Sequence, residues 1–298
     1  MRRVLVLVNP KSGLGRSMNR LVGAAEAGWQ GEDIDLYYQM SNSVADGQAK
    51  VRRALERGVD TILVAGGDGM VNTIGAQLIG SEVSFGVLPT GSGNGFARHF
   101  DIPLQPARAA VALRSATPQW IDVGEANGRP FFVTCGMAAD ASLMRHFEKS
   151  PVRGIAPYIF AAAYEIFEYT PQSFVVSLDG GPEESFDDVL AFTVANLTQF
   201  GGGAQIAPQA CADDGLLEMV VVRRQDAAGL AMAIPSLFNG TLDRAPGVTM
   251  RRFQTMDVVR PQPGVIQVDG EVLDAPARIE VRVRRRALRV LVPDSARA

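Results

Sequence analysis

The stretch VAGGDGMVN at residues 64–72 places three glycines around one aspartate, directly after a run of apolar residues. Val64 and Ala65 end a segment that is typical of a buried strand, and the glycines that follow allow a ligand to approach the backbone closely. Backbone N–H groups in such a turn attract an anion, whereas the carboxylate of Asp68 repels one. The two features agree if a cation lies between Asp68 and a phosphate.

The first 120 residues alternate strand-like and helix-like segments. Short β-rich runs predict strands at 4–8, 33–39, 61–65 and 84–89. Longer segments with helical patterns predict helices at 16–28, 44–57, 70–79 and 105–115. This alternation indicates βαβ units, and therefore an α/β fold with a doubly wound parallel sheet that has helices on both faces.

The pattern changes near residue 120. Most later segments are strand-like without intervening helices, for example PFFVTCGM (130–137) and GVIQVDGEV (264–272). They predict a β-rich antiparallel sandwich, interrupted by helices at about 154–169 and 226–239. We therefore expect one domain at 1–120 and a second at 121–298, whose C-terminal end packs back on the first.

Composition and length restrict the class of protein. With 298 residues, 47% of them hydrophobic, the chain is long enough for two packed domains, and its net charge of -3 argues against nucleic-acid binding. Cys135 and Cys211 are far apart and lack metal-ligand spacing, which suits a reducing cytoplasm. Apolar runs fall short of the roughly 20 residues of a membrane span, so we expect only peripheral membrane contact. A homodimer is compatible with the sequence, which does not determine the oligomeric state.

Three loops follow predicted strands of the parallel sheet: NPKSGLGR (9–16), GGDGMVN (66–72) and PTGSGNGFAR (89–98). Because the carboxyl ends of parallel strands meet at one edge, three such loops indicate a ligand site there. Lys11 and Ser12 precede the glycines of the first loop, which excludes a Walker A motif, and the Rossmann fingerprint also fails. The remaining interpretation is a nucleotide held by several loops, with Asp68 acting through Mg²⁺.

Two acidic motifs of the second half each allow two interpretations. In VDGEVL (268–273), Asp269 and Gly270 are typical of a hairpin turn, so Glu271 is either simply solvated or the proton acceptor of a phosphoryl transfer. DDGLLEM (213–219) is either a plain turn or a turn in which one carboxylate and nearby backbone carbonyls bind a hard cation.

Taken together and in this order, the three loops, the DDGLL turn and the late DGE resemble the diacylglycerol kinase catalytic family, which includes bacterial soluble lipid kinases and sphingosine kinases. The resemblance covers nearly the whole chain. It implies an ATP-binding α/β domain, a β-sandwich lipid-substrate domain, an active site in the cleft between them, and ATP- and Mg²⁺-dependent phosphorylation of a lipid hydroxyl in phospholipid metabolism.

The resemblance also assigns residues. It implies Glu271 as the general base and Asp68, near Mg²⁺ and the phosphates, as the second catalytic residue. The DDGLL turn resembles a structural Mg²⁺ site, with Asp214 as side-chain ligand and the carbonyls of Cys211 and Leu216 as contributors. Nucleotide contacts are implied for residues of the three loops and for Ser41, a looser match: Asn9, Ser41, Gly66, Gly67, Asp68, Gly69, Asn72, Thr90, Gly91, Ser92 and Asn94.

Some positions depart from the family pattern. Met70, Thr73 and Gly95 stand where a threonine, a glutamate and an aspartate are usual. Sphingosine-kinase-like branches of the family also lack this aspartate, so the resemblance does not identify diacylglycerol as the substrate. Two alternatives remain. One is an NAD kinase, which also uses a GGDG loop and a β-rich second domain. The other is an inactive nucleotide- or lipid-binding module, because Met70 lacks the hydroxyl that the usual threonine places close to the expected phosphates.

Overall fold

The computed structural model describes residues 1–10, 18–29, 31, 33–142 and 169–294. The predicted helix at 154–169 lies almost entirely outside these residues. The chain divides into two compact units, and each is described by itself. The first comprises Met1–Ile121 and Arg286–Ala298, and the second comprises Asp122–Arg285.

The first unit is built on a parallel sheet of four strands in the order β2-β1-β3-β4. The strands are β1 (Arg2–Val8), β2 (Ile34–Met40), β3 (Thr61–Gly66) and β4 (Ser84–Pro89). The C-terminal end of β17 (Arg278–Val292) extends the sheet beside β4, where Val290 pairs with Phe85. Strands β3 and β4 are buried along their whole length, because both faces of the sheet are covered.

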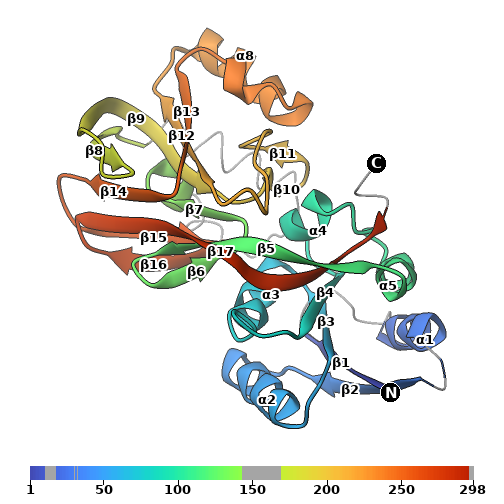
Figure 1. Ribbon diagram of the computed structural model, residues 1–298. Helices are drawn as coiled ribbons and strands as arrows, with labels where there is room; N and C mark the ends of the chain where they lie inside the picture. The colour runs from blue at the N-terminus through green and yellow to red at the C-terminus, as the bar shows by residue number, and fades with distance from the viewer. Residues whose placement is uncertain (11–17, 30, 32, 143–168, 295–298) are drawn as a thin grey trace. The chain divides into compact units, whose positions relative to one another are not determined.

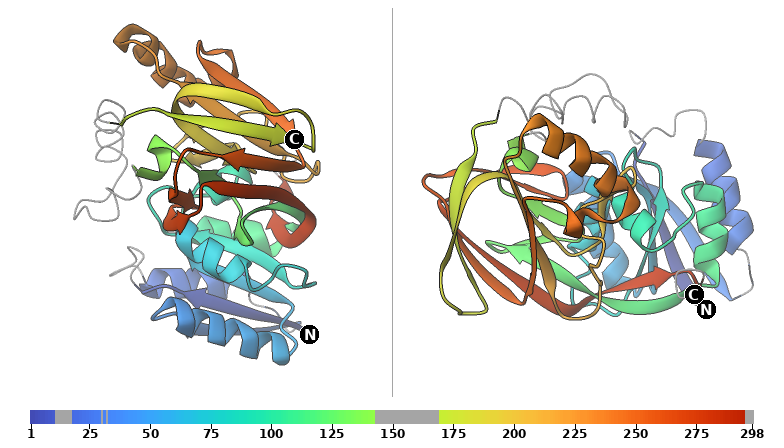
Figure 2. Two further views of the ribbon diagram at one scale, coloured as in Figure 1. Left: turned by 90° about the vertical axis from the view of Figure 1, so that its left-hand side faces the viewer. Right: turned by 90° about the horizontal axis from the view of Figure 1, so that it is seen from above.

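Helices cover the two faces of this sheet (Figures 1 and 2). On one face α1 (Met18–Trp29) packs against α5 (Pro106–Arg114), and on the other α2 (Val44–Glu56) packs against α3 (Asp68–Gly75). The short helix α4 (Gly95–His99), which the sequence pattern did not predict, follows β4. Helix α3 begins two residues earlier than predicted, because the Gly67 carbonyl accepts from the Met70 and Val71 amides. Asp68 is therefore the first helical residue.

The strand order reverses between β1 and β3. From β1 the chain moves outward to β2, and from β3 it moves outward in the other direction to β4. In open sheets of this kind ligands bind beyond the carboxyl ends of the strands at the point of reversal. Asn9 follows β1 and Gly67 follows β3, so both lie at that point.

The second unit is an antiparallel β structure, as predicted. Its main sheet has the order β16-β15-β7-β9-β8-β14-β17, β12 pairs with both β9 and β13, and β5 pairs with β6. The strands are β5 (Thr117–Ala126), β6 (Arg129–Phe131), β7 (Thr134–Gly136), β8 (Gln172–Leu178), β9 (Glu184–Ala195), β12 (Leu217–Arg223), β13 (Val248–Phe253), β14 (Thr255–Val259), β15 (Gly264–Val268) and β16 (Glu271–Ala275).

Smaller elements complete this unit. Strands β10 (Gln199–Gly201) and β11 (Ala204–Gln205) form a separate ribbon. Helix α8 (Ala227–Asn239), which was predicted, precedes a 3₁₀ turn, η2 (Leu242–Arg244). The core contains fully buried phenylalanines from β6, β8, β9 and β13, among them Phe174 and Phe192, whose ring centroids are 5.0 Å apart. None of the helices in the described ranges is long and apolar enough to cross a membrane.

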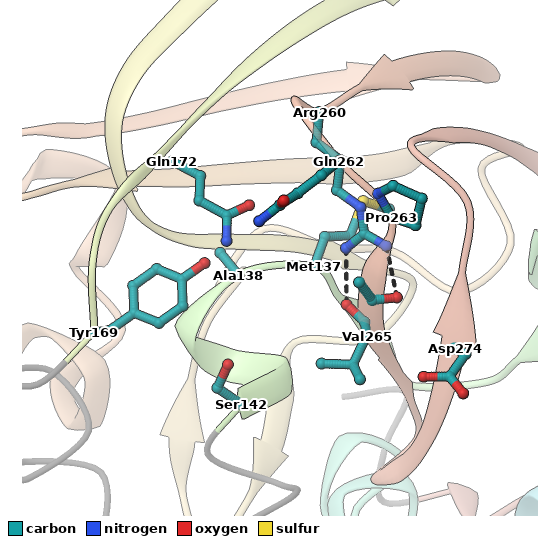
Figure 3. A pocket seen from close by; sticks show the side chains of 11 residues that line it. Met137, Ala138, Ser142, Tyr169, Gln172, Arg260, Gln262, Pro263, Val265 and Asp274 are labelled. Atoms are coloured by element: carbon teal, nitrogen blue, oxygen red, sulfur yellow. Dashed lines mark hydrogen bonds between the residues drawn. The ribbon is translucent and has the colours of Figure 1, made fainter.

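A buried arginine organises the turn between β14 and β15 (Figure 3). Only 4% of the surface of Arg260 is exposed. Its Nη1 donates to the Val265 carbonyl at 2.9 Å, and its Nη2 donates to the carbonyls of Gly264, Ala275 and Pro276 at 2.8, 2.9 and 3.3 Å. These bonds fix the guanidinium plane and hold the start of β15 against the end of β16.

Candidate functional site

Backbone hydrogen bonds align the carboxyl ends of the four parallel strands. The Ser41 amide donates to the Val8 carbonyl at 2.7 Å, and the Asn9 amide donates to the Ala65 carbonyl at 3.0 Å. The Thr90 amide donates to the Gly66 carbonyl at 3.1 Å. The structure thus places the predicted nucleotide residues after β1, β2, β3 and β4 along one edge of the sheet.

The two glycine-rich loops after β3 and β4 touch through their backbones. A Cβ atom at Gly91 would lie 2.6 Å from the Cα atom of Gly67, a distance that real Cβ contacts do not reach. This close approach requires glycine at position 91, because the obstructing atom belongs to backbone that cannot rotate away. The two loops therefore form one continuous surface at the sheet edge.

This contact gives a stability prediction. Gly91→Ala is expected to lower the free energy of unfolding by about 1–3 kcal/mol, the usual cost of forcing an added methyl into packed structure. Gly69→Ala is the matched control in the same pair of loops, because a Cβ there meets no atom within 4 Å. The control is expected to be neutral or to stabilise helix α3 by up to about 1 kcal/mol. Urea unfolding of both variants measures the difference, and equal stabilities would contradict the contact.

Asn94 fixes the shape of the loop after β4. It adopts the left-handed conformation, with φ of 51°, immediately before α4. Its Oδ1 accepts from the Gly91 amide at 3.0 Å and its Nδ2 donates to the Gly91 carbonyl at 2.8 Å. In this structure the buried Asn94 side chain therefore shapes the loop, and Ser92 between the two residues is exposed.

The carboxylate of Asp68 faces the start of α4. Its Oδ1 accepts from the Phe96 amide at 3.3 Å, and the amides of Asn94 and Gly95 also stabilise its charge. Burial nevertheless raises the pKa of Asp68, because the loss of water outweighs these bonds. No lysine or arginine among the described residues forms an ion pair with Asp68, so a divalent cation would supply a counter-charge that the described side chains do not.

Met70 packs inward from α3. It is buried, and its Sδ and Cβ atoms each lie 2.7 Å from the position that a Cβ at Gly66 would occupy. Gly66 is therefore needed to accommodate the methionine. The residue that replaces the usual threonine fills space beside the end of β3.

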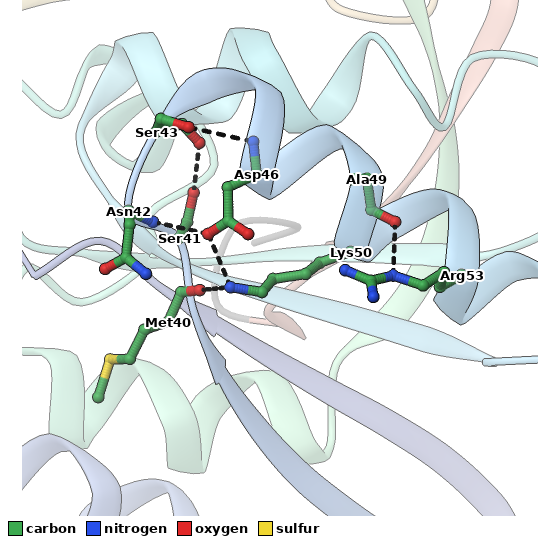
Figure 4. Close-up of polar contacts among 8 residues, drawn as sticks. All are labelled: Met40, Ser41, Asn42, Ser43, Asp46, Ala49, Lys50 and Arg53. Atoms are coloured by element: carbon green, nitrogen blue, oxygen red, sulfur yellow. Dashed lines mark hydrogen bonds and ion pairs between the residues drawn. The ribbon is translucent and has the colours of Figure 1, made fainter.

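Ser41 belongs to the turn that starts α2 (Figure 4). Its hydroxyl donates to the Ser43 carbonyl at 3.2 Å, and the Ser43 hydroxyl caps the helix by accepting from the Asp46 amide at 3.2 Å. Lys50 bonds the Asp46 carboxylate at 2.7 Å and thereby lowers the pKa of that carboxyl. The segment ADGQA is thus the first part of a capped helix, and it keeps Ser41 at the sheet edge.

In the second unit, Asp269 is a structural anchor. Its side chain accepts from three successive backbone amides, those of Phe132, Val133 and Thr134, at 2.8, 2.8 and 3.0 Å. Asp269 and Gly270 both have positive φ, at 47° and 89°, and form the predicted hairpin turn between β15 and β16. Glu271 follows as the first residue of β16, and its side chain is exposed. The hairpin therefore holds Glu271 on a rigid element at the edge of the sheet.

The DDGLL turn is shaped by acidic side chains. Asp214 Oδ1 accepts from the Leu216 amide at 3.0 Å, and the buried Asp122 accepts from the Gly215 amide at 2.6 Å. Asp214 Oδ2 lies 3.5 Å from Nη1 of Arg252, whose Nε bonds Glu218 at 2.7 Å. Among the described residues no three His, Cys, Asp or Glu side chains cluster as a metal site. The predicted donors, one carboxylate and two carbonyl oxygens, nevertheless have the oxygen chemistry that suits Mg²⁺.

Sequence reasoning missed Asp140, which lies after β7. Its carboxylate accepts from the Ala138 and Ala141 amides at 2.8 and 3.1 Å and from the Thr193 hydroxyl at 2.7 Å. Burial raises the pKa of Asp140 to about 6, despite these bonds. A single aspartate in GMAADAS has no spacing signal, because its partners come from β9 and from its own turn.

The raised pKa predicts a pH dependence of stability. Between the unfolded pKa of about 4 and the folded pKa of about 6, the folded protein binds more protons at Asp140 than the unfolded chain does. The contribution of this group to the free energy of unfolding is thus complete below the window and is lost as the pH rises through it. Asp140→Asn keeps the two backbone bonds to Oδ1, and its Nδ2 donates to the Thr193 hydroxyl, which reverses that bond. The variant should lack this slope, measured as the difference between wild-type and variant unfolding curves across the window. Parallel pH profiles would contradict the assignment.

Two family models together match almost the whole chain. The model described as the diacylglycerol kinase catalytic domain matches residues 3–126, and the one described as the YegS C-terminal NAD kinase beta sandwich-like domain matches residues 132–292.

Relatives that match along nearly their whole length have names that agree with these two family models. A protein of Pseudomonas aeruginosa named "Probable lipid kinase YegS-like" is 31% identical, with 98% of this chain and 94% of the relative covered. A "Diacylglycerol kinase" of Mycobacterium tuberculosis is 29% identical, with 98% and 95% covered. Among solved structures, a putative diacylglycerol kinase from Bacillus anthracis superposes with a TM-score of 0.78 at 20% identity, over 99% of this chain and 98% of that one, and this likeness supports the fold alone.

Proposed function

Because the chain belongs to the diacylglycerol kinase catalytic-domain family, we propose that it transfers the γ-phosphate of ATP to a lipid hydroxyl in the presence of Mg²⁺. The observation that carries this proposal is the single edge formed by Asn9 after β1 and by the loops after β3 and β4, at the point where the strand order reverses. Residues 1–120 form the nucleotide-binding domain in this proposal, and residues 121–298 form the lipid-substrate domain.

The proposal gives each loop a task. Phosphate oxygens approach the side-chain-free backbone where the loops touch at Gly67 and Gly91, and the Gly67 N–H donates to them, since the Gly91 N–H already donates to Asn94. Asn9, Ser41 and Asn72 contribute polar side chains at the same edge. Asp68 holds Mg²⁺, which neutralises charge on the transferred phosphoryl group.

Glu271 is proposed as the general base. An alcohol is a poor nucleophile until its proton is removed, and a carboxylate in contact with the hydroxyl can accept that proton. Glu271 is exposed and is carried by the hairpin that Asp269 anchors, so its backbone position is fixed while its carboxylate stays accessible. The acceptor is proposed to be a diacylglycerol-like or related lipid alcohol, presented at a membrane surface to a cytoplasmic enzyme.

A structural Mg²⁺ at the DDGLL turn is part of the proposal, with Asp214 and the carbonyls of Cys211 and Leu216 as ligands. Since Mg²⁺ would bind only the folded turn, it should raise the melting temperature of the wild type. Asp214→Asn should abolish that rise without nucleotide present, whereas Asp243→Asn, at a carboxylate outside this turn, should retain it. A melting temperature that is insensitive to Mg²⁺ and to a chelator would remove the metal from this turn.

Nucleotide consumption with different acceptors tests the proposed activity against its alternatives. ADP release would be followed with Mg²⁺ and ATP in the presence of micellar lipid alcohols or of NAD, which the name of the second family model makes the relevant competitor. Stimulation by a lipid alcohol supports the proposal. Stimulation by NAD alone supports an NAD kinase, and ATP binding without stimulation by any acceptor supports an inactive binding module.

A further inference from the structure

The second unit contains a cavity of about 270 Å³ that the proposed phosphoryl transfer does not use. It lies beside the turn between β14 and β15, and Figure 3 shows the side chains around it. The Tyr169 hydroxyl and the amides of Gln172 and Gln262 turn toward one another there. The cavity is therefore lined by hydrogen-bonding groups from separate segments, together with the guanidinium of Arg260.

Arg260 brings a positive charge that no carboxylate of the described residues pairs with. The four oxygens that it bonds are backbone carbonyls, which carry no net charge. None of the ion pairs in the described part of the chain includes Arg260, and its buried Nε atom has no acceptor there. Buried charges are normally paired, because an isolated one is costly. Burial lowers the pKa of Arg260, but a guanidinium remains charged at neutral pH.

The charge is also held in place. The carbonyls of Gly264 and Ala275 hold Nη2 from two different strands, so the guanidinium cannot turn toward solvent. Among the described residues that line the cavity, one has a carboxylate: Asp274, which is exposed on β16 and lies opposite Val265 of β15. No ion pair joins Asp274 to Arg260 in the described structure. A fixed cation and converging amide and hydroxyl groups favour an anion with several oxygens.

We propose that this cavity binds a phosphate group, either as free phosphate or as the headgroup of a phospholipid. The guanidinium of Arg260 supplies the positive charge beside the phosphate, and the amide groups of Gln172 and Gln262 donate to its oxygens. Ser142 and Tyr169 supply hydroxyl groups on the remaining sides. The volume also leaves room for several waters, since each occupies roughly 30 Å³ in the liquid.

Two isosteric substitutions change the charge of the cavity lining in opposite directions, and together they test whether the cavity prefers a negatively charged ligand. Gln262→Glu adds a negative charge to the lining and should weaken the binding of inorganic phosphate about tenfold. Asp274→Asn removes a negative charge and should strengthen binding by several fold. Both residues are exposed, so neither change should disturb folding, and the melting temperature of each variant checks this. Arg260 itself is left intact, because its loss would release four carbonyl bonds.

Calorimetric titration of the full chain with inorganic phosphate, without ATP, measures these affinities. Weakening by Gln262→Glu together with strengthening by Asp274→Asn supports the site with free phosphate as a ligand. The same pair of shifts seen only with phosphatidylglycerol vesicles, and not with inorganic phosphate, supports a headgroup. Identical affinities in all three proteins, reversed signs, or no binding to either probe would overturn the proposal. Because the titration contains no ATP, its outcome is independent of the kinase assay.

Discussion

Asp68→Asn is expected to lower kcat on the order of 100- to 1,000-fold while leaving the protein folded. Asparagine keeps an oxygen that can accept from the Phe96 amide, so the start of α4 retains its partner. It lacks the negative charge that would hold Mg²⁺ against the phosphates, and the transition state therefore loses electrostatic stabilisation. Steady-state kinetics with varied Mg²⁺ measure the loss.

Asp101→Asn is the control for this change. Asp101 lies just beyond α4 with φ of 49°, a conformation that asparagine also adopts, and it belongs to none of the three loops. Its kinetics should match the wild type. If Asp68→Asn shows an unchanged kcat and the same Mg²⁺ dependence, Asp68 only caps the short helix α4 and takes no part in catalysis.

Glu271→Gln is expected to lower kcat on the order of 100- to 10,000-fold, the usual contribution of a positioned general base. The change preserves shape, and its site on β16 is exposed, so the melting temperature should not move. ATP affinity should also be unchanged, because the base acts on the lipid hydroxyl. Glu280→Gln, at an exposed glutamate on β17, should keep full activity.

The outcome for Glu271 separates its two interpretations. A folded variant that binds ATP but transfers no phosphate supports the role of proton acceptor. Turnover at the wild-type rate would leave Glu271 as a solvated residue next to a hairpin turn, and the base would have to be sought elsewhere.

Much of the fold follows from local sequence patterns. Strand β4 was predicted with its observed bounds, since its apolar run SFGVLP is continuous and is followed by Thr90 and Gly91. Strands β13 and β14 have weaker local patterns, because arginine and aspartate interrupt VTMRRF and TMDVV, and their assignment depends on pairing with β12, β8 and β17. Short helix α4 was missed because its first residues read as part of a glycine-rich loop.

Several structural roles at the site could not be predicted from the sequence, because they depend on contacts between residues that are distant in the chain or on loop conformation. Asp269 accepts a hydrogen bond from the Phe132 amide, which is 137 positions away in the chain, so the sequence predicted the turn at Asp269 but not its anchoring role. The roles of Asn94 in shaping its loop and of Gly91 in touching Gly67 depend likewise on loop conformation. Arg260 had no signal in the sequence, because the partners that the described structure gives it are four backbone carbonyls.

The most direct test of the proposed kinase is to identify the phosphorylated product. Purified protein, Mg²⁺ and ATP labelled in the γ-phosphate would be incubated with micellar diacylglycerol, phosphatidylglycerol, sphingosine and ceramide, followed by solvent extraction and mass spectrometry. Label in a lipid phosphate ester, absent with Glu271→Gln and without Mg²⁺, is the predicted result. Label that remains in the aqueous phase with every lipid, while ATP still binds, would contradict a lipid kinase acting on these acceptors.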